Sequence, residues 1–118
     1  MIDLLLRLAR SRVGRFFWGV VFTRMSFLMP VDRLLETDTL LAFYHPRPAY
    51  PVHVLLIPKS PFASLLDVPA DDPFPAELFR AVQTLVPRLG LGQGYRLIAN
   101  GGDNQDVPHL HFHLIADK

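Results

Sequence analysis

The apolar residues of this chain fall into short blocks separated by prolines, glycines and charged residues, and the pattern of each block predicts its structure. Five blocks are short and bounded by turn residues, which is typical of strands. The block at 52–58 is almost continuously apolar, which indicates a strand buried on both faces. The predicted strands cover residues 33–36, 39–44, 52–58, 95–100 and 109–116.

One longer block has helical spacing. Proline at its first position and Gly90 just beyond its last turn are typical of helix ends, so we predict a helix over about 75–89. Pro87 is expected to distort the last turn. The segment 62–75 before this helix is predicted to be a loop-rich crossover with a helical turn at 63–66. The apolar stripe of the helix consists of Leu78, Val82, Leu85, Val86 and Leu89.

The order strand–strand–strand–helix–strand–strand predicts an α+β fold. In this class a mainly antiparallel sheet of about five strands has its helices on one side. The chain has 118 residues, which suits one compact domain, and we place that domain at 30–118.

Residues 1–29 have a different character, because they hold five arginines and one acidic residue. Apolar residues at helical spacing alternate with these arginines, so we predict an amphipathic helix. We favour packing of this helix on its own domain or on a sister subunit. Contact with an anionic membrane surface is the alternative, since arginine and aromatic residues favour it. The apolar runs are too short for a membrane span, and arginines interrupt them, which argues against a signal peptide.

Composition excludes several function classes. The formal net charge is +1, which gives no electrostatic reason to expect nucleic acid as a partner. The chain has no cysteine, so disulfides, thiolate metal sites and a cysteine nucleophile are excluded. A cytoplasmic location is compatible with this composition and is our expectation.

The segment His109-Leu110-His111-Phe112-His113 carries the chemistry. Alternate residues of a strand share a face, so the three imidazoles are expected side by side, about 6–7 Å apart. One interpretation is a metal site, since imidazole is a common zinc ligand. No thiolate or carboxylate other than Asp106 stands at an obvious companion position, however. The favoured interpretation is nucleophilic catalysis, in which a neutral ring nitrogen attacks phosphorus and water then releases the bound group.

This segment resembles the signature of the histidine triad (HIT) family, in which three histidines alternate with apolar residues. The stretch Gln105-Asp106-Val107-Pro108-His109 resembles the family's lead into the triad. The resemblance covers roughly residues 30–116 and is closest to the Hint-type branch of purine nucleoside phosphoramidases. Its other parts are 41–43, 51–59, 89–91, 94–96 and 100–102.

The resemblance implies a nucleotidyl hydrolase or transferase that cleaves a phosphoramidate or phosphoanhydride bond. His111 would be the nucleophile and would carry a covalent nucleotidyl group, and His113 would contact the α-phosphate. His109 and His53 would orient and polarise these groups, although His53 is also open to a purely structural reading as a hydrogen-bonded core histidine. The resemblance further implies a nucleoside monophosphate-containing small molecule as substrate, a symmetric homodimer with joined sheets, and no metal or other cofactor.

Asn100 and Gln105 would lie near the phosphate or ribose, although Asn100 is also open to a structural role at a strand end. Phe43 and Tyr44 would line the base pocket.

The chain departs from the family pattern at positions that would contact the substrate. The loop 100–105 looks about two residues shorter than in Hint proteins, and the chain ends soon after the triad. Asp106 stands where Hint proteins usually have serine, so it would either repel a phosphate or, if protonated, act as a general acid. His45 stands where the family usually has an acidic residue that binds the ribose, and its imidazole could still hydrogen-bond the ribose, less strongly than a carboxylate. These departures favour the runner-up function, a nucleotide-binding protein with little or no turnover. A metal-dependent hydrolase is a third hypothesis, which loss of activity with a chelator would favour.

Overall fold

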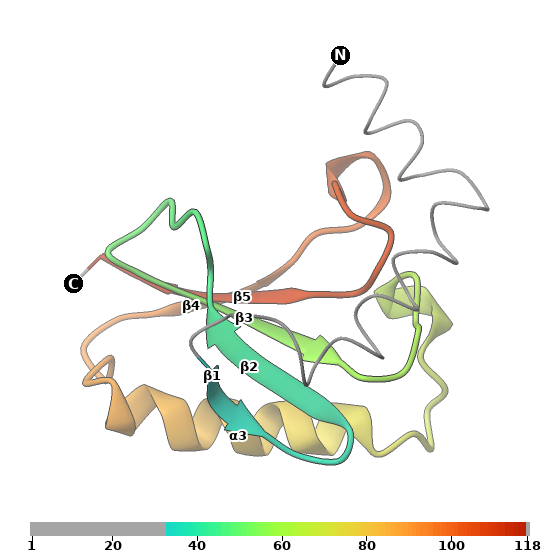
Figure 1. Ribbon diagram of the computed structural model, residues 1–118, viewed down its shortest axis with the longest axis horizontal. Helices are drawn as coiled ribbons and strands as arrows, with labels where there is room; N and C mark the ends of the chain where they lie inside the picture. Colours follow the sequence, from blue (N-terminus) through green and yellow to red (C-terminus); the bar gives the residue numbers. More distant parts are fainter. Residues whose placement is uncertain (1–32, 118) are drawn as a thin grey trace.

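The computed structural model describes residues 33–117, which form one five-stranded antiparallel sheet with a long helix on one face (Figure 1). The strands lie in the order β1-β2-β3-β5-β4, so β1 and β4 are the two edges. The predicted α+β class is confirmed. Their bounds are β1 Arg33–Glu36, β2 Leu40–Tyr44, β3 Val52–Pro58, β4 Arg96–Ala99 and β5 Phe112–Ala116.

Strand pairing assigns the residues to two faces of the sheet. Val54 lies opposite Leu114, and Leu55 lies opposite His113, and the side chains of these neighbouring β3 residues point to different faces of the sheet. The face that carries Val54 packs on the helix and forms the main core. The other face carries His53 and His113, together with a small buried cluster of Leu41, Phe43 and Ile57.

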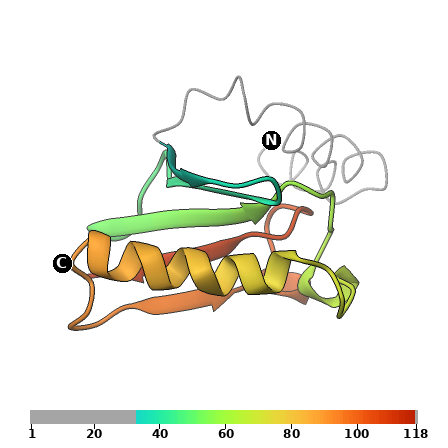
Figure 2. The same ribbon diagram turned by 90° about the horizontal axis from the view of Figure 1, so that it is seen from below.

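The helix α3 spans Phe74–Arg88, within one residue of the predicted bounds, and lies across the sheet (Figure 2). The side chain of Asp72 accepts a hydrogen bond from the Phe74 amide at its start. Gly90 ends the helix in the left-handed region, with φ of 71°, as its position predicts. The residues that α3 buries are Phe74, Leu78, Ala81 and Leu85.

The strand predicted at 109–116 begins three residues later than expected, at Phe112. The reason lies in the neighbouring strand, because Pro58 has no amide hydrogen and cannot extend the ladder. The Leu110 amide donates instead to the carbonyl of Phe62. His109 and His111 therefore lie before β5, and the prediction of three strand histidines is wrong for these two.

Two short 3₁₀ turns lie in the connecting segments: η2 at Leu65–Asp67, near the predicted turn, and η3 at Gly102–Asn104. The amphipathic helix predicted for 1–29 lies outside the described residues. Within residues 33–117, no helix has the length and apolar character needed to cross a membrane.

Candidate active site

The face of the sheet opposite α3 presents side chains in rows across β3, β5 and β4. Antiparallel pairing places the members of a row directly opposite one another on the same face. One row consists of Leu55, His113 and Ile98, and the next consists of His53, Ile115 and Arg96.

The ring of His111 is held in one tautomer by the backbone. Its Nδ1 lies 2.8 Å from the carbonyl oxygen of His109, which can only accept a hydrogen bond. The neutral ring therefore carries its proton on Nδ1, and Nε2 keeps a free lone pair. This is the arrangement that a nucleophilic imidazole needs.

A second chain of hydrogen bonds fixes His53 and His113. The amide of Ala49 donates to Nδ1 of His53 at 3.1 Å, so the proton of the neutral His53 ring sits on Nε2. That Nε2 lies 2.9 Å from Nδ1 of His113 and donates to it. The neutral His113 ring must then carry its own proton on Nε2. His113 is thus a hydrogen-bond donor beside the nucleophile, and the two ring centroids are 5.1 Å apart.

His45 joins this group from the loop after β2. The Arg47 amide donates to its Nδ1 at 2.9 Å, so the neutral ring is also a donor through Nε2. Its ring packs on His53 with centroids 4.4 Å apart and lies 6.4 Å from His113.

The environment keeps these rings neutral. Burial lowers the pKa of His113 to about 4, assisted by the neighbouring His111, His53 and His45, while Asp106 acts in the opposite direction. Burial also lowers the pKa values of His45 and His53, each with a smaller contribution from a neighbouring histidine. His45, His53 and His113 are therefore neutral hydrogen-bonding groups near pH 7.

A cavity of about 210 Å³ opens beside these rings. Five predicted site residues line it: His45, Asn100, Asp106, His111 and His113. Three apolar residues without a predicted site role complete the lining: Leu55, Ile57 and Val107. The alternation of side chains along the predicted strand 52–58 could have located Leu55 and Ile57, because they share a face with His53.

Five other predicted residues do not line the cavity. His53 is 6% exposed and contacts two residues of the lining, His113 through a hydrogen bond and His45 through ring packing. His109 is 1% exposed, and its Nε2 donates to the carbonyl of Pro58 at 3.0 Å. Burial lowers the pKa of His109 to about 4, so its ring is neutral near pH 7.

Gln105, Phe43 and Tyr44 are also outside the lining. The Gln105 amide donates to the carbonyls of Ala63 and Val107, at 2.6 and 2.9 Å, and so ties the loop 101–108 to the segment after β3. Phe43 is 2% exposed within its apolar cluster, and Tyr44 pairs with Val54 on the face that carries α3. A base-binding role for either aromatic ring stays a prediction.

The backbone groups that hold the tautomers could not be identified from spacing alone. The carbonyl of His109 and the amides of Ala49 and Arg47 are positioned by tertiary structure. The prolines of the loop 45–51 and Pro108 are the sequence signal for those local conformations. The part of the chain that the structure describes contains no group of three or more side chains placed to hold a metal ion.

Comparisons with known proteins identify similar sequences and similar structures. An uncharacterized 13.2 kDa HIT-like protein of Azospirillum brasilense is 39% identical over 95 residues, covering 76% of this chain and 78% of the relative. A HIT family hydrolase from Legionella pneumophila has a similar structure, with a TM-score of 0.74, 31% identity, and coverage of 86% and 91%. A histidine triad nucleotide-binding protein from Candida albicans gives a TM-score of 0.70 at 29% identity, over 83% of this chain and 71% of that one.

The model of the family described as the HIT domain matches residues 28–118, which is most of the chain. The family match includes all five strands, α3 and the histidine cluster. This chain therefore belongs to the HIT domain family.

Proposed function

We propose that this protein is a Hint-type nucleotidyl hydrolase or transferase that cleaves nucleoside phosphoramidates or phosphoanhydrides through a covalent intermediate on His111. The observation that carries the proposal is the tautomer of His111, whose Nδ1–H is bound to the His109 carbonyl beside the cavity. A relative described as a HIT family hydrolase supports the hydrolase class.

The proposed reaction consists of two successive displacements at phosphorus. In the first, Nε2 of His111 attacks phosphorus, the bond from phosphorus to the leaving nitrogen or oxygen breaks, and the leaving group takes up a proton. The ring then carries both Nδ1–H and the nucleotidyl group, and its positive charge is stabilised by the His109 carbonyl 2.8 Å away. In the second displacement, water attacks phosphorus, loses its proton, and returns the electron pair to Nε2.

The donors beside His111 suit the phosphoryl oxygens. His113 presents Nε2–H because its Nδ1 is occupied by His53, and His45 presents Nε2–H because its Nδ1 is occupied by the Arg47 amide. Asn100 lines the same cavity and adds an amide. We therefore assign His113, His45 and Asn100 to phosphate or ribose binding, with His53 as a positioning residue.

The stereochemical course of hydrolysis tests the two-step mechanism. A nucleoside phosphoramidate made chiral at phosphorus with sulfur should be hydrolysed in ¹⁸O water with retention, because each displacement inverts the centre. Inversion would show direct attack by water and would contradict a covalent intermediate.

A nucleotide-binding protein without turnover is the second candidate. Asp106 favours it, since the cavity lining contains this carboxylate and neither lysine nor arginine. Binding of a nucleoside monophosphate, measured by calorimetry, with no release of amine from an adenosine phosphoramidate would support this candidate and contradict the first.

A homodimer is part of the proposal. The strand β4 is an edge of the described sheet and pairs only with β5 there, so its outer backbone groups can pair with a second copy. The exposed Phe79 of α3, near Leu97 of β4, adds apolar surface on that side. Sedimentation at micromolar concentration should give twice the mass of the chain, and a monomer would refute the dimer.

A further inference from the structure

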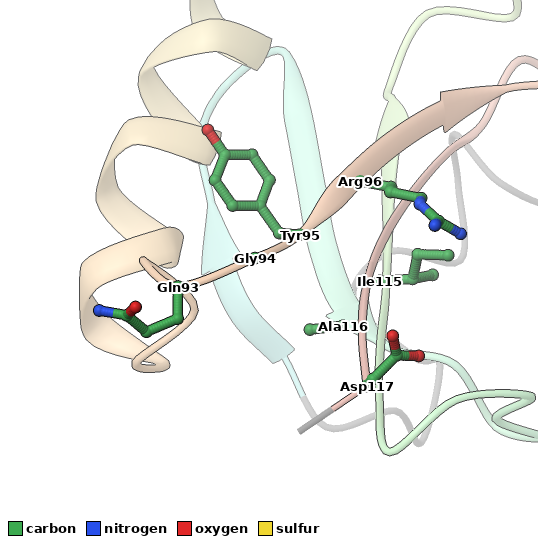
Figure 3. A pocket seen from close by; sticks show the side chains of 7 residues that line it. All are labelled: Gln93, Gly94, Tyr95, Arg96, Ile115, Ala116 and Asp117. Atoms are coloured by element: carbon green, nitrogen blue, oxygen red, sulfur yellow. The ribbon is translucent and has the colours of Figure 1, made fainter.

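A second cavity, of about 440 Å³, lies where β4 begins and β5 ends (Figure 3). The side chains of Arg96, Ile115 and Asp117 point to one side of the sheet there, while Tyr95 and Ala116 point to the other (Figure 3). Ile115 lies opposite His53 in the strand pairing, so the first three side chains share the face of the candidate active site.

Arg96 is the positively charged residue of this cavity. Its side chain is exposed, and within residues 33–117 its guanidinium makes neither a hydrogen bond nor an ion pair. The cavity beside His111 has no cation of its own in its lining. Arg96 is therefore a positive charge next to a site that is otherwise built from neutral donors and one carboxylate.

Strand pairing places Arg96 diagonally next to His113, the residue to which the proposed function assigns the phosphate. Arg96 pairs with Ile115, so His113 is its diagonal neighbour on the same face. Diagonal neighbours in an antiparallel pair lie about 7–8 Å apart, which long side chains can span. The guanidinium can thus contact a group that extends from a phosphate held by His113.

The direction of displacement selects which part of the substrate meets Arg96. In an in-line displacement, the leaving group departs on the side of phosphorus opposite the nucleophile. From His111, β5 leads past His113 to Ile115, and Arg96 lies beside Ile115 on the next strand. A leaving group displaced in this direction, from His111 past His113, would lie on the side of Arg96.

We propose that this second cavity is a leaving-group subsite in which Arg96 binds a negatively charged substituent, a carboxylate or a phosphate, on the group displaced from phosphorus. This inference rests on the proposed function of His111. A guanidinium donates two parallel hydrogen bonds to such a group, which a lysine could not match. Pairing of two β4 edges would use backbone groups and would leave Arg96 on the face of the sheet.

Asp117 adds a negative charge to the subsite, opposite in sign to that of Arg96. Its carboxylate lines the same cavity, on the same side of the sheet as Arg96 (Figure 3). An anionic substituent is attracted by Arg96 and repelled by Asp117. Removal of each charge should therefore change the preference for charged leaving groups in opposite directions.

The test compares three substrates that share one nucleoside phosphate and differ in the displaced amine, which is neutral, carboxylate-bearing or phosphate-bearing. The readout is the ratio of kcat/KM for each charged substrate to kcat/KM for the neutral one. Arg96→Gln should lower this ratio roughly fivefold, as expected for one solvent-accessible ion pair, and Asp117→Asn should raise it. Both changes should shrink at high salt. Arg80→Gln, on the exposed surface of α3, is the matched control and should leave the ratio unchanged.

The ratio of dissociation constants for non-hydrolysable analogues of the three substrates provides the same test without turnover. A normal ratio in Arg96→Gln, by both measures, would overturn the subsite while leaving the role of His111 intact. An inactive wild-type protein whose binding ratio still depends on Arg96 would contradict the proposed hydrolysis and support the subsite. If Arg96→Gln changes the ratio for only the carboxylate-bearing or only the phosphate-bearing substrate, that substrate identifies the substituent that Arg96 binds.

Discussion

The two faces of the sheet are built from alternate residues of the same strands, yet they are held together by different forces. On the face covered by α3, residues such as Val54, Leu56 and Leu114 are fully buried and make apolar contacts. On the opposite face, His53 and His113 are held by one hydrogen bond between two imidazole nitrogens. The first face depends on burial and volume, and the second depends on which nitrogen carries a proton.

This difference teaches that stability and reactivity can be changed separately in this domain. Adjacent residues of β5, such as His113 and Leu114, belong to different faces and different networks. A substitution on the core face should act on the free energy of unfolding, and a substitution on the histidine face should act on rate or binding.

The largest expected effect is that of His111→Ala on turnover. The variant should lose about four orders of magnitude in kcat on an adenosine phosphoramidate, because nucleophile and supporting groups act as a unit. Its melting temperature should stay close to that of the wild type, since the His111 ring is only half-buried. Near-normal kcat in the purified variant would contradict the assignment.

Leu114→Ala should lower the stability of the fold and leave the rate of turnover nearly unchanged. Leu114 is fully buried, so truncation should lower the free energy of unfolding by roughly 4 kcal/mol, as measured by urea denaturation. The folded variant should keep kcat/KM within tenfold of the wild type. A loss of rate as large as that of His111→Ala would show that the two faces are not independent.

The stability of the domain should fall as the pH is lowered from about 6.5 to about 4. The unfolded His109 takes up a proton near its ordinary pKa of 6.5, whereas the buried ring resists it until about pH 4. Its contribution, roughly 3 kcal/mol, is complete above pH 6.5 and is lost as the pH falls toward 4.

Urea denaturation across this pH range provides the measurement, and His109→Gln is the matched variant. Glutamine can still donate to the Pro58 carbonyl but does not titrate, so its stability should depend less steeply on pH. Equal slopes for the two proteins would exclude His109 as the source.

The smallest effect is expected for Asp106→Ser. Asp106 lines the cavity and raises the pKa of His113, which places its negative charge near the phosphate position. Its removal should increase kcat/KM on adenosine phosphoramidates roughly threefold by relieving repulsion. A lower kcat and a lost alkaline limb of the pH profile would show instead that Asp106 is a general acid.

Periodicity in the sequence predicted the core face well, because apolar alternation reports burial directly. The helix bounds were predicted within one residue from Pro75 and Gly90, since each of these residue types favours a helix end. The start of β5 was not predicted correctly, because it depends on the missing amide hydrogen of Pro58, some fifty positions away in the sequence.

The candidate site was predicted in part of its residues but not in its hydrogen bonds. The spacing of His111 and His113 placed both in the cavity, whereas His109 turned out to be buried against Pro58. The packing of His45 on His53 depends on the path of the loop 45–51, which no periodic pattern encodes. No site role was predicted for Arg96, because its position beside the histidines follows from strand pairing alone.

The most direct test of the central claim is the mass of the protein during turnover. Wild-type protein quenched while it hydrolyses an adenosine phosphoramidate should gain the mass of one nucleoside monophosphate residue. Peptide mapping without acid should locate this group on His111, and His111→Ala should show no adduct. Turnover without any adduct on rapid quenching, or an adduct on another residue, would contradict the account.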